Sequence, residues 1–357
     1  MTRLDIAHQR LHNQRIARGE PGSPDCAVAW MGALQAQDYP NAKWAIGLRS
    51  HGATDATVER AISDARIVRT WLNRGALHFV AAPDARWMLE LLAPGIISGR
   101  AGRHRQLGLD AATFALSFDA LARALQGSRP LTRAGTFQVL ARAGVSTEGQ
   151  RGYHILGRAA LEGLICFGPM QGKEQTFVWL DEWVPPGMTL DRDAALAELA
   201  WRYVASHGPA ALPDFAWWSG LPMRDARAAL ELAAPRLHQE MMDGEPYWLA
   251  ADGSATGSPS PAVHLLPAFD EYLLGYSSRD AVLDPQTNIE VVSSNGVFRP
   301  VLVIDGQVTG IWKRTIKRDR VDIRPIPFRP LSESENQALV CAANRFGTFL
   351  ARPVSLS

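Results

Sequence analysis

Cysteine is scarce in this chain of 357 residues, which contains three, Cys26, Cys166 and Cys341. They are odd in number, far apart and set among apolar neighbours. They therefore do not suggest the disulfide framework that stabilises small secreted domains. A chain of this length buries enough surface to fold without disulfide bonds. We therefore expect a protein of a reducing compartment, the cytoplasm.

Long apolar runs are also missing. No window approaches the roughly 18 apolar residues of a membrane-spanning helix. The first 20 residues are polar and charged and lack the apolar centre of a signal peptide. We expect no membrane association.

The sequence has no clear metal or nucleotide site. Its nine histidines have no ligand spacing with the scattered cysteines, so structural histidines are the simpler interpretation. The segment Gly168–Glu174 is too short for a phosphate-binding P-loop and has glutamate where serine or threonine would reach magnesium. We expect neither a metal nor a cofactor.

The net charge is only +1, which is weak for a protein that binds a polyanion. The charge is divided unevenly along the chain. Residues 1–182 contain 21 Lys and Arg against 16 Asp and Glu, whereas the remainder contains 16 against 20. Any field that attracts an anion must therefore come from the arrangement of arginines in the N-terminal half.

Caps and apolar spacing predict helices and then a hairpin in the first 80 residues. Serine or threonine before an apolar period is typical of a helix start, and proline at the first position fits there. The β-branched and aromatic run that follows favours two strands around Leu72–Gly75. The expected elements are helices from Ser23-Pro24, from Tyr39 to Leu48 and from Thr54, and strands Ile67–Trp71 and Ala76–Val80.

The same order of helices and hairpin occurs twice more, and such repetition rarely arises by chance. A helix-turn-helix followed by a two-stranded wing is a winged helix, whose second helix can enter the DNA major groove. The second copy comprises helices from Thr132 and over Thr147–Gly163 with strands Ile165–Phe167 and Phe177–Leu180; the third comprises helices Ala194–Ser206, Pro213–Trp218 and Arg224–Ala234 with strands Leu237–Met242 and Tyr247–Ala250.

The last hundred residues change to a period of two, which favours strands. Asp305-Gly306 between two apolar runs is a strong hairpin signal, because both central turn positions need positive φ. Ser332 and Glu335 form a possible capping box for a closing helix through about Leu350. The predicted fold is α+β, with winged helices at 1–110, 111–190 and 191–250, a linker at 251–262 and a small β-barrel domain at 263–357.

One short segment, Leu34–Pro40, leaves a helix and turns before the next, so we expect it to be extended. On an extended backbone, side chains two apart point the same way, so Gln35 and Gln37 can hold one water molecule between them. The alternative is that both glutamines finish a helix and satisfy loop amides.

Around these glutamines and along most of the chain the sequence resembles the AlkZ-like, or YcaQ-type, winged-helix DNA glycosylases. Their signature is Gln, an aliphatic residue, then Gln or Asp, and Gln35-Ala36-Gln37 matches its first form. The resemblance also rests on the segments Val68–Trp71, Arg74–Phe79, Gly149–His154, Leu180–Pro185, Asp214–Gly220, Leu266–Tyr276 and Asn295–Pro300.

The resemblance implies three winged helices and a β-barrel curled around duplex DNA, with excision of alkylated or bulky-adduct purines, crosslinked ones included. Gln35 and Gln37 would be catalytic, and Asp38 would add negative charge near the sugar. No lysine stands at a motif position suited to a Schiff base, so we expect a monofunctional enzyme. We expect a monomer without cofactor, associated with the nucleoid, and we do not assume full base flipping.

Clustered polar residues are the candidates for DNA contact, because phosphates are bound by arginines and by polar groups. For each group a solvated or exposed polar surface is the alternative. The candidates are Arg100, Arg103, His104 and Arg105 after the first hairpin; Arg69, Asn73 and Arg74 within it; and Gln150, Arg151 and His154 on the second recognition helix.

Two further charged groups have simpler explanations. The basic stretch Lys313–Arg320 is interspersed with acidic residues and is expected to be an edge-strand charge pattern. Asp270-Glu271 is expected to start a helix or mark a domain junction, although it can face the site. The main alternative to an enzyme is a non-catalytic, regulatory DNA-binding protein, which would show sequence preference. The third hypothesis is a structural or partner-binding relative without catalytic activity, in which the two glutamine side chains would not converge.

Overall fold

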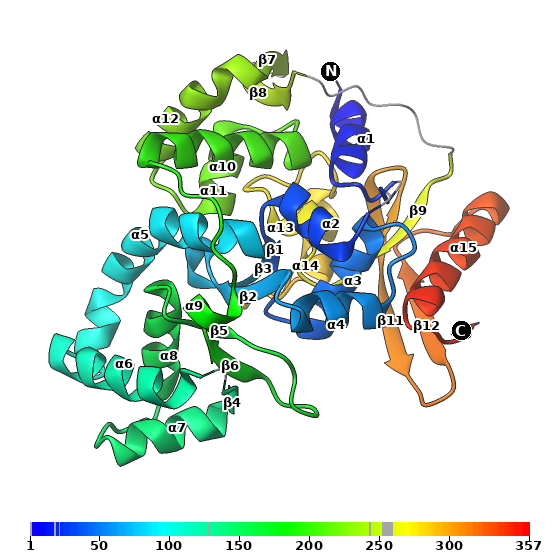
Figure 1. Ribbon diagram of the computed structural model, residues 1–357. Helices are drawn as coiled ribbons and strands as arrows, with labels where there is room; N and C mark the ends of the chain where they lie inside the picture. Colours follow the sequence, from blue (N-terminus) through cyan, green and yellow to red (C-terminus); the bar gives the residue numbers. More distant parts are fainter. Residues whose placement is uncertain (1, 18, 21, 128, 243, 252–259) are drawn as a thin grey trace. The chain divides into compact units, whose positions relative to one another are not determined.

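The computed structural model describes residues 2–17, 19–20, 22–127, 129–242, 244–251 and 260–357. These form two units, unit 1 with residues 1–59 and 196–357 and unit 2 with residues 60–195. Each unit mixes helices and strands (Figure 1). Most of the predicted linker lies outside the described residues, and the predicted domain boundaries stay predictions.

The N-terminal part of unit 1 confirms the predicted helix starts. Pro24 occupies the first turn of its helix after Ser23, although the Ser23 hydroxyl makes no capping hydrogen bond and contacts the Cys26 sulfur at 3.3 Å instead. The Thr54 hydroxyl accepts from Thr57 N at the third helix. The elements are α1 (Arg3–Asn13), α2 (Pro24–Met31), β1 (Leu34–Gln35), α3 (Tyr39–Arg49) and α4 (Asp55–Ser63), which continues into unit 2.

After unit 2 the chain returns to unit 1 with helices followed by a hairpin, as predicted. Gly220, at φ 75°, ends the second of these helices in a left-handed conformation that glycine adopts at little cost. The elements are α10 (Arg192–His207), which begins in unit 2, α11 (Leu212–Ser219), α12 (Met223–Ala233), the 3₁₀ turn η3 (Ala234–Arg236), β7 (Leu237–Met242) and β8 (Glu245–Ala250).

The C-terminal strands form a curled half-barrel sheet in the order β13-β12-β11-β10-β9, where a barrel was predicted. Asp305 and Gly306 both have positive φ, 48° and 82°, as predicted for the β10–β11 turn. The capping box of Ser332 and Glu335 is also present. The elements are β9 (Val263–Leu266), α13 (Glu271–Leu274), η4 (Pro285–Thr287), α14 (Asn288–Val291), β10 (Val301–Ile304), β11 (Gln307–Ile316), β12 (Val321–Pro327), α15 (Glu333–Phe349) and β13 (Val354–Leu356).

Aromatic packing joins α3 and α15 to this sheet. Trp44 meets Phe346 and Phe349 with ring centroids 5.0 and 5.1 Å apart, and Phe346 also meets Trp312 of β11. The Trp44 and Trp312 indole N–H groups donate to carbonyls of β9. A Cβ at Gly47 would lie 2.5 Å from the Phe349 ring, so only glycine allows this approach of the two helices. The packing fixes α3, and with it the chain just before α3.

A buried histidine in this sheet makes stability depend on pH. Burial lowers the pKa of His264 from 6.5 to about 4, so the unfolded chain binds more protons between those values. We therefore expect the free energy of unfolding to fall as pH drops from 6.5 towards 4, by roughly 3 kcal/mol from this group. Urea denaturation of wild type and His264→Gln over this range checks it, because the substitution should flatten the slope. An unchanged slope would contradict it.

Unit 2 contains the first two predicted hairpins in one sheet that includes the order β3-β2-β5-β6-β4. Two long helices, α5 and α6, were not predicted. The helix α8 begins four residues later than expected, because Gly149 just before it has φ 59°. The elements are β2 (Ile67–Trp71), η1 (Asn73–Gly75), β3 (Leu77–Ala81), η2 (Ala82–Asp84), α5 (Ala85–Gln106), α6 (Ala111–Leu125), β4 (Leu131–Thr132), α7 (Arg133–Arg142), α8 (Arg151–Leu161), β5 (Ile165–Phe167), β6 (Thr176–Trp179) and α9 (Leu180–Trp183).

Candidate functional site

The Gln35-Ala36-Gln37 segment begins extended, as predicted, with Gln35 in β1, and the chain bends at Gln37. Gly32, at φ 73°, ends α2, and the segment continues through β1 until Asp38 opens α3. The two glutamine side chains meet, because Gln35 Nε2 donates to Gln37 Oε1 at 3.1 Å. The main-chain N–H of Gln37 donates back to Gln35 Oε1 at 3.2 Å. The two side-chain amides of this short segment therefore lie together.

The pair is asymmetric in exposure. Gln35 is 7% exposed and Ala36 is fully buried, whereas Gln37 is exposed. The hydrogen bonds match this asymmetry. The Gln35 side chain, the inner amide, donates to the Gln37 side chain, the outer amide, and accepts from the Gln37 main-chain N–H. Gln35 thus holds the outer amide in place, and Gln37 presents it to solvent.

Asp38 has a structural role in this arrangement. As the N-cap of α3 it accepts from Asn41 N at 3.2 Å and from Asn41 Nδ2 at 2.7 Å. A carboxylate at this position also stabilises the helix through its dipole. Catalytic support by Asp38 stays a prediction.

A buried polar network lies behind the motif, and sequence spacing did not reveal it. The main-chain N–H of Gln35 donates to Glu271 Oε1 at 2.9 Å. Neighbouring Asp270 opens α13, as expected for a helix start, and both its oxygens accept from Arg49, at 2.8 and 3.0 Å. Arg49 also donates to Gln14. The motif backbone therefore rests on groups that are almost completely buried.

The basic stretch Lys313–Arg320 begins in the last part of β11. β11 pairs with β10 at residues 307–311, whereas residues 313–316 pair in the described register with β12 alone, so this part of the strand has one open edge, as expected. Lys317 and Arg320 both pair with Asp322, which fits the expected mixing of charges. Burial lowers the pKa of Arg314, and the nearby Asp38 carboxylate opposes that shift. A guanidinium therefore lies within electrostatic reach of the motif.

In unit 2 the predicted DNA-contact residues of α5 and α8 come together in what we call the α5–α8 cluster, residues Arg100, Arg103, His104, Gln150, Arg151 and His154. Arg103 donates to Gln150 Oε1 at 2.8 Å, and the His104 and His154 rings lie 5.3 Å apart. Arg151 donates to the carbonyls of Leu107 and Gly108. Two separately predicted groups of residues thus lie together in one cluster.

The members of the cluster differ in what they can contact. Arg103, Gln150 and the adjacent Arg105 are exposed on the surface. His104 is 5% exposed, and burial lowers its pKa to about 4, so its ring is neutral at physiological pH. Arg100 donates to the Gly75 carbonyl, which ties α5 to the first hairpin. The exposed arginines are the stronger candidates for phosphate contact.

The hairpin candidates are more enclosed than the sequence suggested. Arg69 is 5% exposed, donates to Gln175 Oε1 at 2.9 Å and lies over the Phe167 ring. Asn73 is fully buried, and Arg74 adopts φ 55° in the turn. Such burial is typical of packing, and DNA contact by these three residues stays a prediction.

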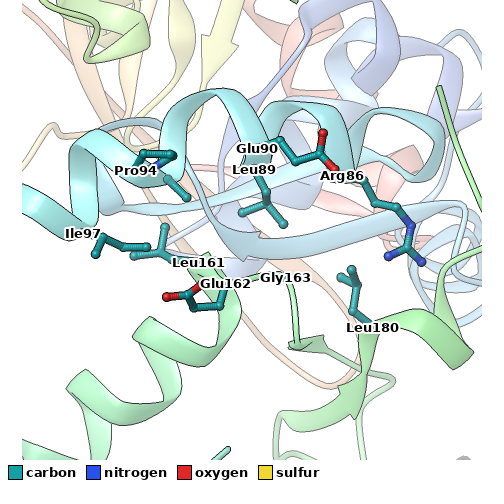
Figure 2. Close-up of a pocket in the computed structure, with 10 residues that line it drawn as sticks. Arg86, Leu89, Glu90, Pro94, Ile97, Leu161, Glu162, Gly163 and Leu180 are labelled. Carbon is teal, nitrogen blue, oxygen red and sulfur yellow. The ribbon is translucent and has the colours of Figure 1, made fainter. Parts of the chain in front are cut away.

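A pocket of about 360 Å³ elsewhere in unit 2 is a poor candidate for a nucleic-acid site. Figure 2 shows Leu89 and Glu90 of α5 on one side of it, and Leu161 with Glu162, which directly follows α8, on the other. Glu162 pairs with Arg158, and Arg86 pairs with Asp181. The lining has two carboxylates and one guanidinium around apolar side chains, so it offers a phosphate no excess of positive charge, and the glutamine motif is the stronger candidate.

Comparisons with known proteins agree with the family resemblance. The DNA glycosylase AlkZ-like family matches residues 28–349, which is most of the chain. This chain belongs to the AlkZ-like DNA glycosylases. An interstrand DNA cross-link repair glycosylase of Streptomyces sahachiroi is 27% identical over 327 residues, which cover 87% of this chain and 86% of that protein. The AlkZ-like assignment makes this protein an enzyme of DNA repair.

A solved AlkZ-like structure supports the fold. The DNA glycosylase AlkZ of Streptomyces sahachiroi superposes with a TM-score of 0.83 at 23% identity, over the whole of both chains. Within the described residues, no cluster of histidine, cysteine, aspartate or glutamate has the geometry to hold a metal ion. Among the described helices, none has the length and apolarity needed to cross a membrane.

The two exposed arginines of α5, Arg103 and Arg105, lead to a prediction about the salt dependence of DNA binding. Replacing both Arg103 and Arg105 by alanine should weaken duplex binding similarly for all sequences, because phosphate contacts carry no base information. The slope of log K against log salt should fall by roughly 1 per arginine. Fluorescence anisotropy across a salt series measures it, with Arg123→Ala, an exposed arginine of α6, as the control. Equal slopes for all three proteins would contradict the assignment.

Proposed function

We propose that this AlkZ-like enzyme hydrolyses the N-glycosidic bond of alkylated purines in duplex DNA, bulky-adduct and crosslinked purines included. The observation that carries the proposal is the hydrogen-bonded pair of Gln35 and Gln37 in an extended segment, with the outer amide at the surface. The cross-link repair activity named for the Streptomyces relative supports bulky substrates.

The proposed reaction needs no strong acid or base, so glutamine side chains are sufficient for it. A purine alkylated at N7 or N3 carries positive charge, so its bond to C1′ breaks with the electron pair leaving on the base, which becomes neutral. The sugar becomes oxocarbenium-like, as in other glycoside hydrolyses. Water then forms a bond to C1′ and releases its proton to solvent, which gives an abasic site. Positioning of the water matters more than its deprotonation.

The proposed roles of the two glutamines differ. A carbonyl oxygen has two lone pairs, so Gln37 Oε1 can accept from Gln35 and also from the attacking water. Gln35 orients that oxygen, and Asp38 adds negative charge near the developing sugar cation.

We further propose a monofunctional enzyme without a lyase step. Lys43 is the lysine near the motif on α3, and its ammonium is bound by Asp55 and Glu59 at 2.9 Å each. A lysine side chain engaged by two carboxylates is poorly placed to form a Schiff base. The attacking group is therefore water.

We propose that the protein acts as a monomer in which three winged helices and the half-barrel bind duplex DNA. The repeated order of helices and hairpins supports this, with the three copies ending in β2–β3, β5–β6 and β7–β8. The α5–α8 cluster supplies phosphate contacts. Arg69, Asn73 and Arg74 of the first hairpin are included with it as predicted DNA contacts.

Release of free base tests the substrate class. Purified protein in excess is mixed with duplexes that each contain one N7-methylguanine, one N3-methyladenine, one N7-linked crosslink or no lesion, and freed base is measured by chromatography. We expect release from at least one lesion and none from undamaged DNA. No release from any lesion, together with tight sequence-dependent binding, would favour the regulatory alternative.

A further inference from the structure

Glu271 is a buried carboxylate that contacts the motif through the backbone. It comes from α13, 236 positions away from Gln35, and its Oε1 accepts from the Gln35 N–H at 2.9 Å. Glu271 is 2% exposed. A hydrogen bond from an amide to a carboxylate is among the strong ones in proteins. The contact therefore fixes the main chain at the start of the motif.

The platform that carries Glu271 is itself held rigidly. Asp270 receives two hydrogen bonds from Arg49 and one from Tyr272 N. The Tyr272 hydroxyl donates to the carbonyls of Gly306, at 2.7 Å, and Ala7, at 3.2 Å. Side chains held by packing and by further hydrogen bonds keep a site within the narrow geometry that catalysis needs. Glu271 is thus a fixed point and not a mobile surface carboxylate.

The groups facing Glu271 leave its acceptor role intact. His207 Nε2 lies 3.7 Å from Glu271 Oε2, which is too long for a direct hydrogen bond. Burial lowers the pKa of His207, although Glu271 opposes the shift, and Nδ1 of that ring lies 2.8 Å from the Ser206 hydroxyl. The ring is therefore neutral at neutral pH and does not draw the carboxylate away from Gln35.

We propose that Glu271 is a positioning residue for the Gln-Ala-Gln motif: by accepting the Gln35 N–H it fixes the extended main chain from which both glutamine amides project. The proposal rests on the catalytic role of the glutamines proposed above. Glu271 is thereby added to the residues on which catalysis depends, although it acts through Gln35 and does not touch the DNA.

Three substitutions separate acceptor geometry from charge. Glu271→Gln keeps an acceptor oxygen at the same length without charge, Glu271→Asp keeps the charge on a side chain one methylene shorter, and Glu271→Leu removes both. The control is Asp214→Asn in the same unit. Asp214 is 3% exposed and accepts from the main-chain N–H groups of Ser277 and Ser278, so it is a buried carboxylate of the same kind.

The measurements are the single-turnover rate of N7-methylguanine release at saturating enzyme and the Kd for undamaged duplex. We expect Glu271→Leu to slow release by about 100-fold, because displacement of about 1 Å costs that much, with Kd unchanged within about threefold. Glu271→Gln should stay within about fivefold of wild type, and Glu271→Asp should be slower than Glu271→Gln. Asp214→Asn should release base at the wild-type rate per folded molecule.

The outcomes are distinct. A Leu variant as fast as wild type, an Asp variant faster than the Gln variant, or an Asp214→Asn control as slow as the Leu variant would each overturn the positioning role. If the Leu variant does not fold, the comparison of Gln with Asp decides alone. Absence of release by wild type from every lesion would instead refute the proposed function itself.

Discussion

Gln35→Glu is expected to slow excision by about 100-fold or more, whereas Gln37→Glu is expected to stay within about tenfold of wild type. A carboxylate at position 35 cannot donate to Gln37 Oε1, so the outer amide turns away and water is misplaced. A carboxylate at position 37 still accepts from Gln35 Nε2 and from water. Single-turnover release of N7-methylguanine measures both variants.

This asymmetry tests the assignment of inner and outer roles. Duplex affinity and the thermal unfolding midpoint serve as controls, because a charge at the 7%-exposed position 35 also lowers stability. Equal losses for the two variants at matched folding would show that both glutamines contact the water in the same way. The hydrogen-bond asymmetry would then have no catalytic meaning.

Arg49→Met is expected to lower the free energy of unfolding by about 3–5 kcal/mol, because it leaves Asp270 buried without its guanidinium. Arg49 is fully buried and donates to Asp270, to Gln14 and to the Ala45 carbonyl. Arg329→Met is the control, since Arg329 pairs with Glu335 at 2.6 Å but is half exposed. Its loss should cost no more than about 1 kcal/mol.

Urea denaturation measures both arginine variants. A similar loss for the two would mean that the buried pair contributes no more than a surface pair. The Arg49–Asp270 pair would then not be what holds α13, and it would give Glu271 no rigid support. A combined Arg49→Met, Asp270→Asn variant should recover part of the lost stability, because the uncompensated charge is gone.

Local sequence features predicted local geometry well. The turn at Asp305-Gly306, the Ser332 capping box and the extended segment at Gln35 each depend on a few adjacent residues, and each is present. The same holds for the strands of the first hairpin, which the structure places within one residue of the prediction. The candidate site could be found because its two amides lie on one short segment.

Long-range features could not be predicted in this way. The contact of Gln35 with Glu271 joins residues 236 positions apart, and no spacing rule connects them. The helix α5 was not predicted at all; it runs through Pro94, and the apolar side chains that precede Pro94 are buried by contacts that the sequence does not reveal. The enclosure of Arg69 and Asn73 likewise depends on packing that a hairpin pattern does not describe.

The central claim is that the glutamine pair positions water for hydrolysis of an alkylated purine. The most direct test compares wild type with the Gln35→Ala, Gln37→Ala double variant in single-turnover reactions on duplexes that contain N7-methylguanine or an N7-linked crosslink. The account predicts abasic sites with wild type, and intact substrate with a double variant that folds and binds duplex normally. Equal excision by the two proteins would contradict it.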